Sequence, residues 1–134
     1  MYRWRFLQFK SSMGRLAIHD WRKAKLSPSR CAIMDTLLDR IAKMQSWPIK
    51  ICGSLKNHPG CSEIRWTAEH VEHRIFGYIQ SGNVFVMLVG CTHKGKVYDP
   101  PSAFDTMDDR KNAVEAGRAE LCDYDIWSSG EDEG

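Results

Sequence analysis

Between residues 63 and 98 lie seven residues whose side chains are of the types that bind and cleave a phosphodiester. They comprise one carboxylate, two arginines, two lysines, a histidine and a tyrosine: Glu63, Arg65, Arg74, His93, Lys94, Lys96 and Tyr98. Cations bind the phosphate backbone and stabilise charge that develops on it, while tyrosine stacks on a base or forms a hydrogen bond. The same residues also fit an ordinary solvated sheet face, because charged side chains are normal surface content.

Three successive strands would carry these residues. Ser62–Trp66 and His70–Gln80 alternate polar and apolar side chains, as half-buried strands do. The turn-forming Ser81–Asn83 follows, and the apolar run Val84–Val89 begins directly after it. We therefore predict an antiparallel meander in which Val84–Val89 is a central strand, covered by helices on one side. A basic loop over Gly90–Tyr98 is expected to leave it.

Side-chain alternation predicts which residues of the meander meet. Glu63 and Arg65 are two residues apart and share one face of their strand. On the next strand, Glu72 and Arg74 lie on one side and His73 on the other. His73 shares its side with apolar neighbours, so we expect a partly buried, hydrogen-bonded histidine there rather than a catalytic one. The arginines and the basic loop are expected to converge on one side of the meander.

Flanking segments complete the predicted fold. Aromatic residues in Arg3–Phe9 predict an N-terminal strand, and Ile18–Lys25 is expected to form a short helix. Ser27 is a candidate N-cap before a proline, and apolar spacings of three and four predict a helix over 27–45. A final helix is expected from Ser102 or Asp105 to Leu121. The predicted class is α+β: a small antiparallel sheet of the N-terminal strand and the meander, packed against two N-terminal helices, with a C-terminal helix.

Charge is unevenly distributed along the 134 residues, although the net charge is only +2. Residues 1–98 carry 16 Lys and Arg against 6 Asp and Glu, whereas residues 99–134 carry 3 against 11. We expect a single domain over 1–127 and an acidic, disordered tail over 128–134. No apolar run approaches the roughly 20 residues of a membrane-spanning helix, and charges interrupt the N-terminal segment. A cytoplasmic protein without a membrane partner is expected.

Five cysteines form an odd set without a C-x-x-C pair. Neither a disulfide framework nor a zinc site is indicated, so reduced, mostly buried thiols are expected, with no metal and no cofactor. Cys91 borders the basic segment, where nearby cations would lower the pKa of its thiol. No base is identifiable that would make it a nucleophile.

The order of these elements resembles the RelE/HigB-type toxin superfamily of bacterial toxin-antitoxin modules, within it the phage-derived Gp49-like branch. The resemblance covers roughly Trp4 to Tyr124. It rests on the order and spacing of five segments: Phe6–Arg15, Leu37–Ala42, Ser62–Trp66, His73–Tyr78 and Gly90–Lys96. A RelE-like fold is therefore implied.

The resemblance also implies a function. Nuclease members of the family cut messenger RNA, commonly on the ribosome and without a metal, by attack of the ribose 2′-hydroxyl on the adjacent phosphate. The chain would then be a toxin that inhibits translation and is neutralised by a cognate helix-turn-helix antitoxin. Arg65 and Arg74 would bind phosphate, Lys94 or Lys96 would stabilise the transition state, and Tyr98 would orient the RNA.

Two positions depart from the family pattern. Glu63 stands where some members have a lysine, and Thr92 where some have an arginine that helps protonate the leaving group. Glu63 or His93 would then be the general base, and His93 or Lys94 the acid. Two alternatives remain open: a ParE-like toxin that binds a topoisomerase without cutting nucleic acid, and a phage-encoded RNA-binding or host-interaction module. The sequence does not predict an oligomeric state.

Overall fold

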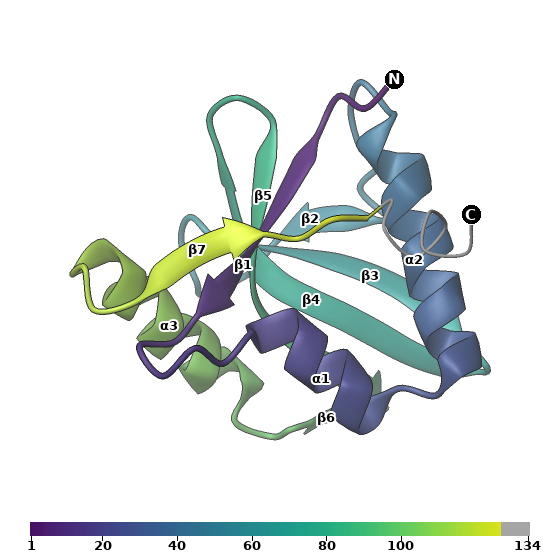
Figure 1. Cartoon of the computed structure of the whole chain (residues 1–134). Helices are drawn as coiled ribbons and strands as arrows, with labels where there is room; N and C mark the ends of the chain where they lie inside the picture. Colours follow the sequence, from purple (N-terminus) through teal and green to yellow (C-terminus); the bar gives the residue numbers. More distant parts are fainter. Residues whose placement is uncertain (127–134) are drawn as a thin grey trace.

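The computed structural model describes residues 1–126, which contain three helices and seven strands. In chain order they are β1 (Arg5–Lys10), α1 (Ala17–Lys25), α2 (Pro28–Ala42), β2 (Cys52–Ser54), β3 (Ser62–Ala68), β4 (Val71–Gln80), β5 (Val84–Lys94), β6 (Val97–Asp99), α3 (Ala103–Glu115) and β7 (Glu120–Asp123). One mixed sheet has the order β2-β3-β4-β5-β1-β7, with β6 paired to β5 (Figure 1). The α+β class, the N-terminal strand and the meander are confirmed. The predicted tail at 128–134 lies outside the described residues.

The meander β3-β4-β5 forms the middle of the sheet and sets the register of the candidate site. Arg65 on β3 pairs with Arg74 on β4, which in turn pairs with Cys91 on β5. An irregularity between Phe76 and Gly77 shifts the β4–β5 register. A Cβ atom on Gly77 would lie 1.8 Å from the carbonyl oxygen of Val86, so this close approach of two strands requires glycine.

The prediction of an antiparallel sheet is wrong at β1. This strand runs parallel to β5, with Arg5 beside Val84, and antiparallel to β7, with Leu7 beside Asp123. A parallel pair needs a long crossover connection, and here the helices α1 and α2 with strands β2, β3 and β4 supply it. Strand pairing across such a separation leaves no local signal in the sequence.

Two predicted segments differ in the structure. The basic loop over Gly90–Tyr98 is instead a β-hairpin, because β5 continues to Lys94 and a turn with Gly95 at a φ of 63° leads into β6. The final helix ends at Glu115 rather than Leu121, since Gly117 takes a φ of 74° and the chain then enters β7. The second helix begins as predicted, with the Ser27 hydroxyl accepting a hydrogen bond from the backbone N–H of Arg30.

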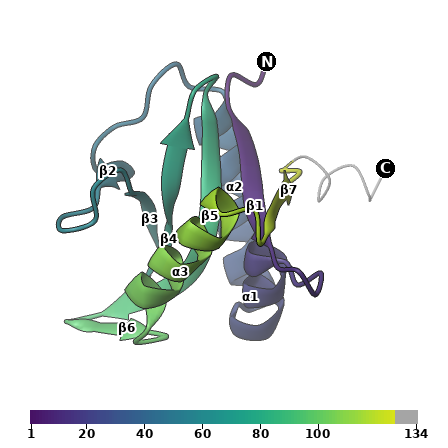
Figure 2. The same cartoon turned by 90° about the vertical axis from the view of Figure 1, so that its left-hand side faces the viewer.

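Helices cover both faces of the sheet, not one as predicted. Figure 2 shows α3 on the side opposite α1 and α2. Ile64 and Phe85 face the core beneath α1 and α2, whereas Phe76 and Leu88 face the core beneath α3. Strand β5 is central, as predicted, and is buried from Val84 to Cys91. The single helix α3 packs against β4 and β5, and the charged residues of β3 and β4 lie on this same face.

Candidate functional site

Two arginines lie opposite each other on the α3 face of the sheet. Arg65 and Arg74 are cross-strand partners, and partners in a sheet point to the same side. Glu63 shares that side with Arg65 and pairs with Phe76, whose ring stacks on Phe104 of α3 at 4.6 Å between centroids. The predicted convergence of Glu63, Arg65 and Arg74 is therefore present.

The carboxylate of Glu63 bridges the two arginines. Its Oε2 accepts a hydrogen bond from Arg65 Nη1 at 3.0 Å, and its Oε1 accepts one from Arg74 Nη1 at 2.9 Å. The Glu63 side chain is only 7% exposed. A buried carboxylate is stable when its charge is paired and its oxygens are hydrogen-bonded, and both conditions hold here. A substrate hydroxyl has little access to it, which disfavours Glu63 as general base.

Arg74 has a second carboxylate partner, Glu72, on its outer side. Arg74 Nε donates to Glu72 Oε1 at 3.0 Å and Nη2 donates to the same oxygen, while Nη1 also donates to the Tyr98 hydroxyl at 3.4 Å. Burial disfavours the charged guanidinium, but the hydrogen bonds to Glu72 and the charge of Glu63 outweigh it and raise the pKa of Arg74. The Glu72 side chain is 38% exposed, so solvent reaches this outer pair.

Arg65 uses its remaining donors to hold the chain before β2. Its Nε donates to the carbonyl of Lys50 at 3.1 Å, and its Nη2 donates to the carbonyl of Ile49. A Cβ on Gly53 would lie 2.9 Å from Nη2, so glycine leaves room for the guanidinium to cross β2. Arg65 therefore connects the segment before β2 to β3 by hydrogen bonds. A phosphate could bind Arg65 only by displacing one of these contacts.

His93 and Tyr98 face each other across the β5–β6 hairpin and lie beside Arg74. We call the whole group the arginine cluster; it consists of Glu63, Arg65, Glu72, Arg74, His93 and Tyr98. Their rings stack with centroids 4.2 Å apart, and Arg74 Cζ lies 5.8 Å from the Tyr98 centroid. His93 Nδ1 is buried without a hydrogen bond, 3.9 Å from Glu72 Oε2. Burial, partly opposed by the Arg74 charge, raises the pKa of Tyr98, so the phenol stays neutral near pH 7. His93 has a ring nitrogen without a hydrogen-bond partner in the described residues, whereas both oxygens of Glu63 accept hydrogen bonds from the arginines.

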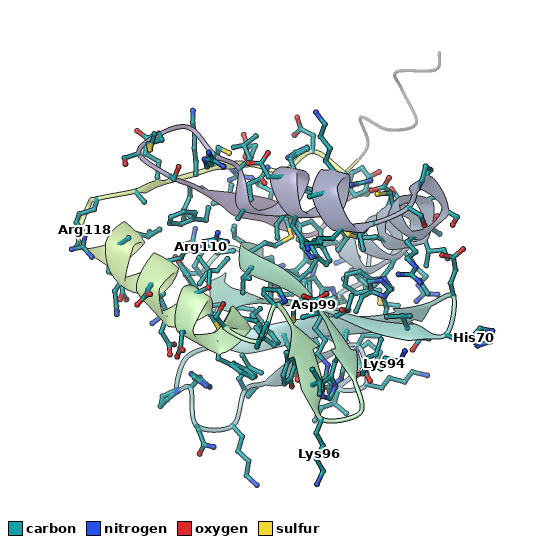
Figure 3. All side chains as sticks on the ribbon, turned by 90° about the horizontal axis from the view of Figure 1, so that it is seen from below. His70, Lys94, Lys96, Asp99, Arg110 and Arg118 are labelled. Atoms are coloured by element: carbon teal, nitrogen blue, oxygen red, sulfur yellow. The ribbon has the colours of Figure 1, made fainter. Side chains whose placement is uncertain are left out.

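The two predicted lysines lie outside this cluster. Figure 3 shows Lys96 at the tip of the β5–β6 hairpin, directed away from the sheet. Lys94 directly follows His93 in β5 and, by strand alternation, lies on the opposite side of the hairpin. Thr92 likewise pairs with His73, on the face beneath α1 and α2. Lys94 and Thr92 are therefore not positioned to transfer protons at the cluster.

Glu72 belongs to the cluster, although the sequence pattern predicts only its face of the strand and no role for it. The signal was its position two residues before Arg74, where strand alternation puts both side chains on one side. For Cys91, the expected lowering of the thiol pKa is wrong: burial, only partly opposed by Arg74, raises it to about 12. His73 is hydrogen-bonded as predicted, through its Nδ1 and the Val71 carbonyl at 2.9 Å, but it is fully rather than partly buried.

Comparisons with protein-family models, with curated proteins and with solved structures found no match to this chain. The resemblance to the RelE/HigB superfamily therefore stays a prediction. In the described part of the chain, no helix has the length and apolar content needed to span a membrane. Over the same residues, His, Cys, Asp and Glu side chains form no group of three or more that could hold a metal ion.

Proposed function

We propose that this protein is a metal-independent endoribonuclease that binds an RNA phosphate at Arg74, and that it acts as the toxin of a toxin-antitoxin module. Its substrate would be messenger RNA, cut on the ribosome, and a helix-turn-helix antitoxin would neutralise it in the cytoplasm. The observation that supports this proposal most is the pairing of the Arg74 Nε–Nη2 edge with the solvent-exposed carboxylate of Glu72.

A phosphate can replace Glu72 without disturbing the rest of the cluster. Arginine binds carboxylates and phosphates through the same fork of N–H groups, so the outer edge of Arg74 suits either anion. Glu63 holds the inner Nη1 from a side chain that is 7% exposed, and the guanidinium would keep its position during the exchange. Lys94 and Lys96 lie on the neighbouring β5–β6 hairpin and would contact phosphates of the RNA further from the cleaved bond.

The proposed reaction transfers the phosphoryl group from the 5′-oxygen of one nucleotide to the 2′-oxygen of the preceding ribose. The ribose 2′-oxygen bonds to phosphorus and loses its proton to His93, while the bond from phosphorus to the 5′-oxygen breaks and that oxygen takes a proton from water. Arg74 stabilises the added negative charge on the phosphate oxygens. Stacking on Tyr98 holds the His93 ring in place. Of the two predicted bases, we assign the role to His93 because Glu63 is occupied by both arginines.

A second candidate function is an RNA-binding or host-interaction module that does not cut. It is favoured by the charge balance of the cluster, where the positive charges of Arg65 and Arg74 are matched by Glu63 and Glu72. In such a module the four charges would mainly hold β2, β3 and β4 together.

Induced expression without an antitoxin tests the proposal. The wild type is expected to stop growth and to produce new 5′ ends within messages, whereas Arg74→Ala and His93→Gln are expected to leave messages intact. Lys23→Gln removes an exposed cation from α1 and serves as the matched control, with cleavage unchanged. Circular dichroism of each purified variant verifies folding.

Other outcomes separate the alternatives. RNA that is bound but never cut, even on ribosomes, would replace the nuclease with the binding module. A DNA-damage response with intact messages would indicate a topoisomerase poison. Unaffected growth together with intact messages in the wild type would reject the toxin proposal.

A further inference from the structure

A cleft lies between α1 and α3, away from the arginine cluster. It has a volume of about 330 Å³, within the usual range for pockets that bind small molecules. Its walls are largely apolar and come from four elements and the segment before α3. The residues that line it include Phe9, Leu16, Trp21, Val89, Pro100 and Arg110. Figure 3 shows Arg110 reaching from α3 toward the α1 side of the molecule.

The cleft exists because β1 stops before β5 does. Strand β1 pairs with β5 only as far as Met87, and β6 pairs with the same edge of β5 only from Thr92 onward, so no strand in the described part of the chain covers this edge over residues 88–91. Trp21 of α1 lies against this part of β5: a Cβ on Gly90 would be 2.2 Å from the indole Cε3. Because Gly90 has no side chain, the indole of Trp21 can lie directly on β5, where the indole forms one wall of the cleft.

Arg110 is a partly buried cation without a carboxylate partner among residues 1–126. Its Nη1 donates to the Leu88 carbonyl at 2.6 Å, and its Cζ lies 5.1 Å from the centroid of the Phe9 ring. Burial lowers its pKa, with no neighbouring charge opposing the shift. The comparable arginines Arg22 and Arg74 each have a carboxylate within 3 Å. Placing an arginine in this environment costs free energy that an anion would recover.

Charges at the rim also favour an anion. Arg15 and Lys25 line the cleft, and both are exposed. Asp20 is the one acidic residue that lines it, and its Oδ2 accepts a hydrogen bond from the backbone N–H of Leu16 at 3.1 Å, at the start of α1. Asp20 forms no ion pair with Arg110 in the described residues. The other N–H groups of the Arg110 guanidinium therefore have no protein acceptor there.

We propose that this cleft is a binding site for a small amphipathic carboxylate. The carboxylate would take the free N–H groups of Arg110, and an apolar or aromatic body would lie between Trp21, Phe9 and Leu16. The site uses residues other than the arginine cluster, so the proposal does not depend on RNA cleavage. It predicts that the head group and the body of a ligand contribute separately to affinity.

Matched probes test the site on the full chain. We would titrate 4-phenylbutyrate and 4-phenylbutan-1-ol, which share a body and differ in charge, and follow the Trp21 indole and Gly90 amide signals by NMR. Saturable shifts with the carboxylate and at least about tenfold weaker binding of the alcohol are expected, since a hydrogen bond between two charged groups is stronger than one to a neutral hydroxyl. Equal affinities would overturn the proposal.

Three variants locate the binding. Arg110→Gln keeps a donor for the Leu88 carbonyl but removes the charge, and it is expected to weaken the carboxylate about tenfold or more. Ala24→Phe fills the cleft from an exposed position of α1 and is expected to abolish binding of both probes. Arg118→Gln removes an exposed cation beyond α3 and should change nothing. Unchanged carboxylate binding in folded Ala24→Phe rejects the site even if Arg110→Gln does not fold.

Discussion

The carboxylate of Glu63 accepts a hydrogen bond from Arg74 Nη1 at 2.9 Å, which links β3 to β4 on the sheet face beneath α3. The same carboxylate also accepts from Arg65, so one nearly buried negative charge lies between two positive ones. Glu72 balances the pair from the solvent side. This unequal exposure of the two carboxylates gives them different expected roles, one structural and one exchangeable.

Glu63→Gln should destabilise the protein strongly. The amide cannot balance two arginines in a site that is 7% exposed, and breaking a buried ion pair costs about 3–5 kcal/mol. Urea unfolding measures the loss. Glu72→Gln is the matched control, expected to cost under about 1 kcal/mol because its side chain is 38% exposed. Equal losses in both variants would mean that Glu63 is not the structural carboxylate of the pair.

Glu72→Gln should instead strengthen RNA binding. Removing this carboxylate frees the Nε–Nη2 edge of Arg74 for a phosphate, so we expect about threefold to tenfold tighter binding at low salt and a salt dependence steeper by roughly one phosphate contact. Fluorescence anisotropy with a short single-stranded RNA gives both quantities. Glu69→Gln is the control, because Glu69 pairs with Arg30 away from the cluster. A gain of the same size in Glu69→Gln would point to net charge alone.

The stability of the protein should fall on mild acidification, in part through His73. Burial lowers the pKa of this histidine below its ordinary value of 6.5, and its Nε2 is buried without a hydrogen-bond partner. The unfolded chain therefore takes up the proton first, so the stabilising contribution is present above pH 6.5 and is lost as the pH falls below it.

Urea unfolding at pH 7.5 and 5.5 compares the wild type with His73→Phe, which retains a ring against Trp66. The wild type is expected to lose more stability than the variant over this interval, because only the wild type has the buried histidine whose pKa is lowered. His19, whose pKa burial also lowers, maintains a residual pH dependence in both. His70→Asn, at an exposed turn position, is the control and should behave as the wild type. Identical losses in His73→Phe and the wild type would contradict the assignment.

Gly77→Ala should disrupt the pairing of β4 with β5, because the two backbones could no longer approach each other as closely at this position. The new methyl would lie 1.8 Å from the Val86 carbonyl oxygen, and a backbone atom cannot rotate away as a side chain can. A loss of about 4 kcal/mol or more is expected, at the level of the most damaging single substitutions. Gly82→Ala meets no atom within 4 Å and differs only by its positive φ, so a loss near 1–2 kcal/mol is expected. Thermal unfolding of both variants measures the contrast.

The local pattern of the sequence was sufficient to predict the meander and the face of its charged residues. Alternation assigned Glu63, Arg65 and Arg74 to one side and His73 to the other, and the structure confirms both. It was not sufficient for the hairpin, because the glycine and lysines that form the β5–β6 turn are equally typical of a loop. Nor could it reveal that both arginines are already paired with carboxylates, since this depends on burial and side-chain reach.

One missed residue did leave a signal. Arg110 follows the buried Ala103 and Met107 at helical spacings of seven and three, which places a cation on the core-facing side of α3. An arginine in a position otherwise apolar indicates an unusual partner. The cleft itself could not be predicted, because it results from the different lengths of β1 and β5, and their pairing is not local.

The position of β1 between β5 and β7 constrains the order in which the chain can fold. Arg5 finds its neighbour Val84 only after the meander has been synthesised, and Leu7 finds Asp123 later still. Contacts between such distant residues slow folding, because loop closure must precede any gain from them. Strand β1, which carries Phe6 and Phe9, is therefore synthesised before both of the strands that pair with it, and its two edges stay open until those strands follow.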